Sequence, residues 1–235
     1  MADRASAVIL GAGRGIRLGV GRNKVFLEVA GRPLLAYTLE AFVSSPLIDE
    51  LVVVIAPQDE PLAREVVADL SKPTRLVHGG DERRDSSLAG VNAADGAFVL
   101  IHDAARPFPS PELIARVLDG AHANGACVPV VASTDTLRYR DENGTLHPQR
   151  IERRGLLRMQ TPQGFRTELI RSALAASAHW FTDDAGAILE TGLPVFTVAG
   201  EETNLKVTTP GDLQVAEAFI AHRLRNRSGQ NALAQ

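Results

Sequence analysis

A glycine-rich segment with clustered cations follows the first apolar run of the chain. Residues 7–10 are apolar, and residues 11–24 read GAGRGIRLGVGRNK. Glycines at alternate positions expose backbone N–H groups and permit positive φ, and such loops after a first strand bind phosphate groups. Four cations lie within eleven residues, namely Arg14, Arg17, Arg22 and Lys24. Amides combined with cations favour a bound triphosphate over the alternative, a surface loop with solvated arginines.

The glycine spacing excludes two common nucleotide motifs. It does not match the G-x-G-x-x-G fingerprint of dinucleotide-binding proteins, and no Gly-Lys-Ser/Thr follows as in a P-loop. An acidic residue at a strand end about 20 positions further on is also lacking. These differences count against an NAD-binding oxidoreductase, the competing interpretation at the level of the fold.

An acidic residue follows the apolar run 97–101, where residues 102–107 read HDAARP. Ligands of open α/β sheets bind at the carboxyl ends of the strands, and Asp103 there could hold Mg²⁺ together with phosphate oxygens. The alternative for Asp103 is a turn or helix cap. We expect His102 to be packed and hydrogen-bonded, because no second histidine lies at metal-ligand spacing.

Paired glycines open a third polar segment, GGDERRDSS at residues 79–87, directly after the run 75–78. Glycine lets the backbone approach a planar base, and Asp81 and Ser86 offer hydrogen bonds to the base edge or to a ribose. A turn followed by a capped helix explains the same residues equally well.

The lysines are informative because arginine is the default cation of this chain. Only Lys24, Lys72 and Lys206 are lysines among the 25 Lys and Arg residues. Lys206 lies in NLKVT, residues 204–208, which predicts a strand with a lysine at a sheet terminus. This placement favours a functional role over a snorkelling edge lysine. We interpret Lys72 as a surface loop residue.

A polar stretch between the runs 127–131 and 160–163 contains Asn143-Gly144, a strong hairpin signal. Such a hairpin has little to bury by itself, so it either meets a partner chain or is a solvated excursion. Hydroxyls and arginines bracket it and suit a second phosphate. They are Ser133, Thr134, Thr136, Arg150, Arg153, Arg154 and Thr161.

The elements that must position these residues alternate between short apolar strands and amphipathic helices, which predicts an α/β protein with a mostly parallel sheet. The predicted strands cover residues 7–10, 51–55, 75–78, 97–101, 127–131, 194–198 and 205–208. The predicted helices begin near Pro33, after the N-cap Ser110, near Thr167, near Asp183 and at Thr209.

Composition bounds the class of protein. The chain has 235 residues, 45% apolar and 23% charged, as in one ordinary globular domain. A net charge of −3 argues against a protein that coats nucleic acid, and no apolar run is long enough for a membrane span. The single Cys127 excludes a disulfide framework and fits a buried small hydrophobe. The N-terminus lacks a signal pattern, so we expect a cytoplasmic protein.

Seven segments in order resemble the 2-C-methyl-D-erythritol 4-phosphate cytidylyltransferases of the non-mevalonate isoprenoid pathway, and the likeness runs from about residue 7 to 220. The segments are the glycine-rich loop with NKVFL at 23–27, GGDER at 79–83, HDAARP at 102–107, Asp135-Thr136, QTPQ at 160–163, TDDA at 182–185 and NLKVT at 204–208.

The resemblance implies a Rossmann-like nucleotidyltransferase fold, helices on both faces of a twisted sheet, and a protruding β-arm that pairs two subunits. It implies one domain over residues 1–225 with the arm at about 134–163. The chain is polar beyond about Arg223, which predicts a disordered tail over 226–235. CTP is the implied nucleotide, a polyol phosphate the acceptor, and Mg²⁺ or another divalent cation the metal.

The resemblance also implies roles, residue by residue. Arg17 and Lys24 would stabilise charge at the α-phosphate, and Arg153 and Lys206 would position the acceptor phosphate. Asp103 would lie at the metal and ribose. The nucleotide would be lined by Ala12, Gly13, Gly15, Gly79, Gly80, Asp81 and Ser86. The sugar phosphate would be faced by Arg106, Asp135, Thr136 and Thr161, some of them from the partner subunit.

The chain departs from the family pattern without losing a catalytic side chain. Asn23 stands where the family usually has proline, and Gly11 where it usually has alanine. Related enzymes transfer cytidylyl groups to ribitol 5-phosphate with nearly the same residues, so another polyol phosphate stays open as the acceptor. A guanylyl- or uridylyltransferase and a nucleotide-binding protein without turnover are the remaining alternatives.

Overall fold

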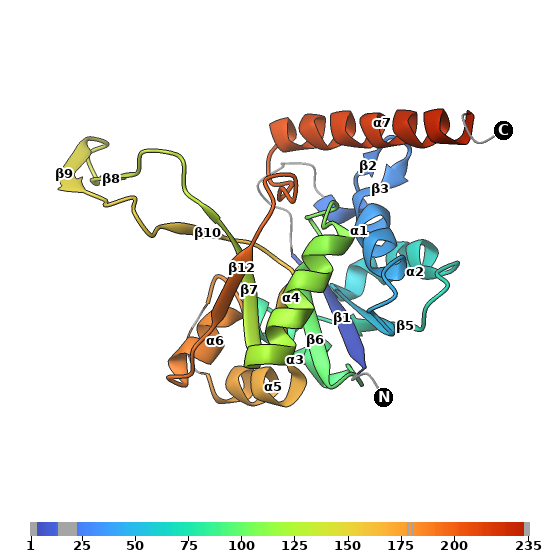
Figure 1. The fold of residues 1–235 in the computed structure, drawn as a ribbon, viewed down its shortest axis with the longest axis horizontal. Coiled ribbons are helices and arrows are strands. Elements are labelled where there is room, and N and C mark those ends of the chain that lie inside the picture. The colour runs from blue at the N-terminus through green and yellow to red at the C-terminus, as the bar shows by residue number, and fades with distance from the viewer. Residues whose placement is uncertain (1–3, 14–22, 178, 180, 233–235) are drawn as a thin grey trace.

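An eight-stranded sheet forms the frame of the molecule (Figure 1). The computed structural model describes residues 4–13, 23–177, 179 and 181–232. The strand order is β10-β7-β11-β6-β1-β4-β5, with β12 also paired to β7. The strands are β1 (Ala5–Leu10), β4 (Glu50–Ile55), β5 (Thr74–His78), β6 (Phe98–Asp103), β7 (Ala126–Ala132), β10 (Leu157–Met159), β11 (Gln163–Arg166) and β12 (Phe196–Ala199).

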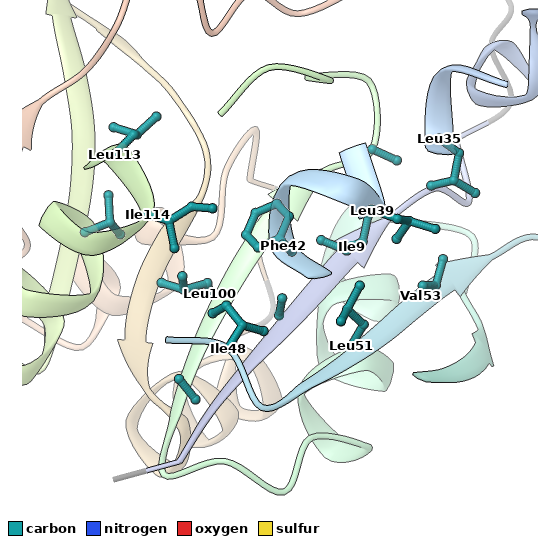
Figure 2. Close-up of a cluster of buried hydrophobic side chains, with 14 of the residues drawn as sticks. Ile9, Leu35, Leu39, Phe42, Ile48, Leu51, Val53, Leu100, Leu113 and Ile114 are labelled. Atoms are coloured by element: carbon teal, nitrogen blue, oxygen red, sulfur yellow. The ribbon is translucent and has the colours of Figure 1, made fainter. Parts of the chain in front are cut away.

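The centre of the sheet is parallel and covered on both faces. β1 pairs in parallel with both β4 and β6, so that Ala7 lies between Leu51 and Leu100. Ile9 and its neighbours on one face pack against α1 (Leu34–Val43) and α4 (Pro111–Asn124), as Figure 2 shows. Val8 on the other face packs against α3, α5 and α6, whose bounds are Arg83–Asn92, Thr167–Ala176 and Ala185–Glu190. These continuous apolar runs confirm the predicted doubly covered strands.

Sequence signals at the helix ends are confirmed where a side chain caps the helix. Ser110 Oγ accepts a hydrogen bond from Leu113 N at 3.0 Å, and Pro111 begins α4. Gly125 ends this helix at φ 82°, a conformation that glycine adopts without strain. α4 then feeds directly into β7, which contains the buried Cys127.

A β-arm leaves the body between β7 and β10 (Figure 1). Its tip is the antiparallel pair β8 (Arg138–Arg140) and β9 (Leu146–Arg150), and Gly144 in the turn has φ 86°. The predicted hairpin is thereby confirmed. The returning chain then enters the sheet, which the sequence pattern does not predict: β11 runs antiparallel to both β6 and β7.

The segment after β12 corrects one prediction. Residues 205–208 are not a strand, although the apolar pattern predicts one. Their backbone groups have other partners, because Val207 N donates to Ala105 O at 2.8 Å and Thr208 N to Asp212 Oδ2 at 2.8 Å. The segment is therefore a braced loop that leads into α7 (Pro210–Ala232).

The C-terminal helix closes a third apolar cluster. Phe108, Val207, Ala216 and Ile220 are buried together, and the rings of Phe108 and Phe219 stack at 5.6 Å. α7 continues to Ala232, beyond residue 226 where the sequence predicts a disordered tail. A nucleated helix gains one hydrogen bond per added residue, and the stretch contains no proline.

Five short elements complete the described chain. They are the 3-10 turns η2 (Lys24–Phe26) and η3 (Pro57–Asp59), the helix α2 (Glu60–Val67), and the small pair β2 (Glu28–Val29) with β3 (Arg32–Pro33). Within the described residues, no helix is long and apolar enough to cross a membrane.

Lys72 lies in the loop before β5, as predicted, and is half-buried there. Its Nζ donates hydrogen bonds to the carbonyl oxygens of Ser45 and Ile48, and burial lowers its pKa. The ammonium therefore ties the loop after α1 to the loop before β5.

Candidate active site

A pocket of about 430 Å³ opens at the carboxyl ends of β1 and β6, where the two glycine segments and the loop 204–208 meet. This is where open α/β sheets bind ligands. The lining residues are Leu10, Gly11, Ala12, Gly13, Asn23, Lys24, Val25, Gly80, Asp81, Glu82, Arg83, Ser86, Asp103, Ala105, Lys206 and Thr208.

Two of the three lysines reach this pocket from opposite ends of the sequence. Lys24 is the first residue of η2, and its Nζ donates to Val207 O at 2.8 Å. Lys206 lies one residue before that carbonyl, and its Nζ lies 2.8 Å from Asp103 Oδ2. The braced loop thus brings both ammonium groups to one side of the pocket.

Asp103 is the buried charge around which the pocket is organised. Its Oδ1 accepts from Arg83 Nη1 at 2.8 Å, and Arg106 Nε lies 3.8 Å from its Oδ2. Burial disfavours the charged carboxylate, but Arg83 and Lys206 outweigh this and hold the pKa of Asp103 well below its usual range. The carboxylate is therefore ionised at neutral pH.

Arg83 is a site residue that the sequence analysis did not single out. Its guanidinium bridges Asp103 and the buried Asp184, with Nη2 lying 2.5 Å from Asp184 Oδ2. The two carboxylates outweigh burial and raise the pKa of Arg83. Arg83 lies in the GGDER segment that the sequence indicated, but Asp184, the partner that fixes its position, lies 101 residues further on.

The layer beneath Asp103 fixes its backbone. Thr161 Oγ1 accepts from Asp103 N at 3.0 Å and contacts His102 Nδ1 at 3.2 Å. His102 Nε2 donates to Arg106 O at 2.9 Å, and burial lowers the pKa of His102 to about 4. The histidine is therefore neutral and packed, as predicted, and Thr161 is buried below the pocket and does not line it.

The glycine segments form one wall because their backbones approach closely. A Cβ on Gly79 would lie 2.7 Å from Ala12 Cβ and 2.6 Å from Ser86 Oγ. α3 begins four residues later with a capping box between Glu82 and Asp85. Both interpretations of residues 79–87 therefore hold: the segment is a capped helix start and a pocket wall.

The structure separates the predicted site residues into three groups. Ala12, Gly13, Lys24, Gly80, Asp81, Ser86, Asp103 and Lys206 line the pocket, with Gly79 directly behind it. Arg106 faces the braced loop, where its Nη1 donates to Asn204 O at 2.8 Å. Asp135, Thr136 and Arg153 are exposed on the arm, and Arg153 Nη1 donates to Thr134 O at 2.6 Å. Gly15 and Arg17 lie outside the described residues.

The donors in the pocket fit a nucleotide-borne Mg²⁺ and do not form a protein cage for a metal. The described part of the chain contains no group of three or more His, Cys, Asp or Glu side chains that could hold a metal ion. Mg²⁺ commonly takes one or two carboxylates together with substrate phosphates and water. Asp103 supplies such a carboxylate at the wall of the pocket.

A mostly parallel sheet with a glycine-walled, lysine-containing pocket at its carboxyl edge is the arrangement of a nucleotide-binding α/β protein. The family model for 2-C-methyl-D-erythritol 4-phosphate cytidylyltransferase matches residues 5–222. The chain belongs to this family.

Individual relatives agree with the family match. The 2-C-methyl-D-erythritol 4-phosphate cytidylyltransferase of Deinococcus radiodurans is 43% identical over 222 residues, covering 93% of this chain and 90% of that protein. That of Geobacillus kaustophilus is 38% identical over 224 residues, covering 93% and 97%. The crystal structure of 4-diphosphocytidyl-2C-methyl-D-erythritol synthase from Anaerococcus prevotii superposes with a TM-score of 0.81 at 30% identity, covering 93% of this chain and 96% of that one.

Proposed function

We propose that this protein transfers the cytidylyl group of CTP to 2-C-methyl-D-erythritol 4-phosphate, giving 4-diphosphocytidyl-2-C-methyl-D-erythritol and pyrophosphate. The family supports this reaction, and the ribitol 5-phosphate alternative is not favoured by the relatives. The observation that carries the proposal is the convergence of Lys24, Lys206 and Asp103 on a pocket walled by glycine backbone.

The chemistry needs charge neutralisation more than proton transfer. An oxygen of the acceptor phosphate attacks the α-phosphorus of CTP and forms a new P–O bond. The bond from that phosphorus to the bridging oxygen breaks, and its electron pair leaves with pyrophosphate. The acceptor phosphate is already anionic at neutral pH, so no general base is required. The site must instead hold two anions together in line.

Two lysines are suited to this task. Lys24, beside the glycine backbone, would stabilise the charge that develops at the α-phosphate, together with Arg17. Lys206, on the braced loop that the Lys24 ammonium contacts through Val207 O, would hold the acceptor phosphate. Its side chain is 39% exposed, so its ammonium can exchange Asp103 for a phosphate oxygen without leaving the pocket.

The nucleotide would occupy the glycine wall. Ala12, Gly13, Gly80, Asp81 and Ser86 would contact the base and ribose, with Gly15 and Gly79 completing the segment. Asp103 would face the ribose and a bound Mg²⁺, which supplies charge neutralisation for the departing pyrophosphate.

The arm would complete the site of a second subunit. Asp135, Thr136 and Arg153 are exposed, and the tip of the arm, formed by β8 and β9, extends away from the sheet (Figure 1). Exposed apolar side chains accompany them, with Tyr139 54% and Leu146 72% accessible. We therefore propose a homodimer in which Arg153 reaches the acceptor phosphate of the partner. Arg106 and Thr161 would shape the acceptor side from below.

We further propose that residues 1–225 act as one nucleotidyltransferase domain, that the protein works in the cytoplasm, and that it uses neither nucleic acid nor a membrane as a partner.

Pyrophosphate release from purified protein tests the function. The protein is incubated with CTP and Mg²⁺, and 2-C-methyl-D-erythritol 4-phosphate is compared with ribitol 5-phosphate. We expect release with the first acceptor and at most background with the second. GTP and UTP replace CTP in parallel reactions and should give little product. Release with ribitol 5-phosphate alone would move the enzyme to another polyol phosphate, and silence with both acceptors would overturn catalysis.

A further inference from the structure

The side chain of Asn23 joins the two ends of the glycine-rich segment. It is only 7% exposed. Its Nδ2 donates to Gly11 O at 2.6 Å and to Asp59 Oδ2 at 2.8 Å, and its Oδ1 accepts from Val25 N at 3.3 Å. Both N–H groups and the oxygen of this buried amide are therefore satisfied.

Two of these partners belong to the rigid frame. Gly11 N donates to Val54 O at 2.7 Å, and a Cβ on Gly11 would lie 3.2 Å from that same oxygen. Gly11 is thus held against the end of β4. Asp59 is buried in η3, directly after β4, and is 8% exposed. Asn23 is consequently tied to the strand end and to the turn that follows it.

The third partner of Asn23, Val25 N, is adjacent to Lys24 in the chain. The bond from Val25 N, together with Phe26 N donating to Asn23 O at 3.1 Å, starts the turn η2. Lys24 is the first residue of that turn, and its ammonium reaches Val207 O across the pocket. A displacement of Asn23 would therefore move Lys24 relative to the backbone of Gly11 and Gly13.

We infer that Asn23 is a positioning residue that sets the place of the Lys24 ammonium relative to the nucleotide-binding backbone. The inference rests on the proposed function, because the α-phosphate of CTP must meet both groups at once. Displacement of a positioning contact by about 1 Å can cost about a hundredfold in rate. The hydrogen bond to Gly11 O is the contact that connects the two groups most directly.

A reciprocal exchange separates this contact from the pairing with Asp59. Asn23→Asp removes the donor to Gly11 O and sets two carboxylates against each other. Adding Asp59→Asn supplies a new donor between positions 23 and 59, with the direction of the bond reversed, but no donor for Gly11 O. The single variant Asp59→Asn keeps both donors of Asn23 and serves as the control.

The measurements are thermal unfolding and steady-state pyrophosphate release with each substrate varied in turn. We expect Asp59→Asn to keep kcat/KM for CTP within about twofold, and the double variant to recover most of the melting temperature lost by Asn23→Asp. We expect kcat/KM for CTP in the double variant to stay at least ~10-fold below wild type, with KM for the acceptor nearly unchanged.

Full recovery of kcat/KM for CTP in the double variant would overturn the inference. An equal rise in KM for both substrates would also overturn it, because a general loosening of the fold would weaken the binding of both. If Asn23→Asp does not fold, Asn23→Ala replaces it, and wild-type activity in that variant contradicts the role. If wild-type protein itself releases no pyrophosphate, the proposed function fails. Calorimetric CTP binding then decides the inference, which requires weaker binding to the double variant than to Asp59→Asn.

Discussion

Lys24 and Lys72 have similar surroundings and different locations. Each is half-buried, and each ammonium donates to backbone carbonyls: Lys24 to Val207, and Lys72 to Ser45 and Ile48. Only Lys24 of this pair lines the pocket. A comparison of the two therefore distinguishes loss of a buried lysine from loss of a catalytic charge.

We expect Lys24→Ala to reduce turnover by ~10²-fold or more while leaving the fold intact, because a cation at the transition state is lost. Arg17→Ala should have an effect of the same size. Lys72→Ala is the matched control: it should lower the melting temperature but leave kcat close to wild type. Pyrophosphate release and circular dichroism measure both quantities, and normal turnover in purified Lys24→Ala would contradict the assigned role.

His102 gives the molecule a pH-dependent stability. Burial lowers its pKa from 6.5 to about 4, so the unfolded chain binds a proton that the folded chain rejects between these values. Stability therefore falls as pH decreases through this window, by up to about 3 kcal/mol. Asp103 has a lowered pKa in the folded protein. Its contribution to stability is lost only when the pH falls below 3.8, the pKa of the carboxyl in the unfolded chain, and this lies outside the window of His102.

Urea unfolding at pH 6.5 and pH 4.5 tests this expectation. The wild-type protein should be less stable at the lower pH, and His102→Gln should show a flatter dependence whatever its absolute stability. Equal slopes in the two proteins would show that other groups cause the pH dependence.

Residue types alone indicated most of the pocket. The glycines and the two informative lysines could be identified because their chemistry is unusual for the positions they occupy. Arg83 could not, because an arginine beside an acidic residue in a polar segment reads as a solvated pair. Its role depends on Asp184, which the fold brings to it from a distant element.

At the scale of elements, α3 is held against the sheet by a glycine. A Cβ on Gly90 would lie 2.4 Å from Val8 Cγ1 and 2.8 Å from Val54 Cγ2. This close approach places the start of α3, with Arg83 and Ser86, at the pocket. The position of the nucleotide wall therefore depends on a packing contact near the other end of the helix.

Gly90→Ala should destabilise the protein by roughly 1–3 kcal/mol, as overpacking of a core does. Gly211→Ala is the control in another helix, where the new Cβ would meet only Thr209 Oγ1 at 3.7 Å. That change should be neutral or stabilising by up to about 1 kcal/mol, because alanine has the higher helix propensity. Denaturant midpoints of both variants decide the matter, and comparable midpoints would refute the packing argument.

Element prediction succeeded where a single local pattern decided the structure. The buried parallel strands and the Ser110 cap follow from periodicity and from one side chain. The strand prediction for residues 205–208 was wrong, because their apolar pattern arises from packing of Val207 under α7 and not from a place in the sheet. β11 was missed because its sequence, QGFR, contains a single large apolar residue, Phe165, and gives no signal of its antiparallel partners.

At the scale of the whole molecule, the arm predicts shared active sites. If Arg153 serves the partner's pocket, Arg153→Ala and Lys24→Ala should each be nearly inactive as homodimers. Heterodimers of the two contain one intact site. Random reassortment should therefore restore ~25% of wild-type activity.

Light scattering at micromolar concentration should show a dimer, and activity of the mixed variants should rise with reassortment. A monomer would contradict the arm proposal. A dimer without restored activity would place Arg153 in the site of its own chain.

The sequence distance between Lys24 and Lys206 has a consequence for synthesis. β1, β4, β5 and β6 are complete by Asp103, so the parallel centre of the sheet can assemble while the rest is still being made. The hydrogen bond between Gln163 and Asp184 can form only after Asp184 has been synthesised, and the bond between Arg106 and Asn204 only after Asn204 has been synthesised. Lys206 emerges after all of them. A nascent chain therefore acquires its frame early, and it gains competence for two anionic substrates only after that frame is complete.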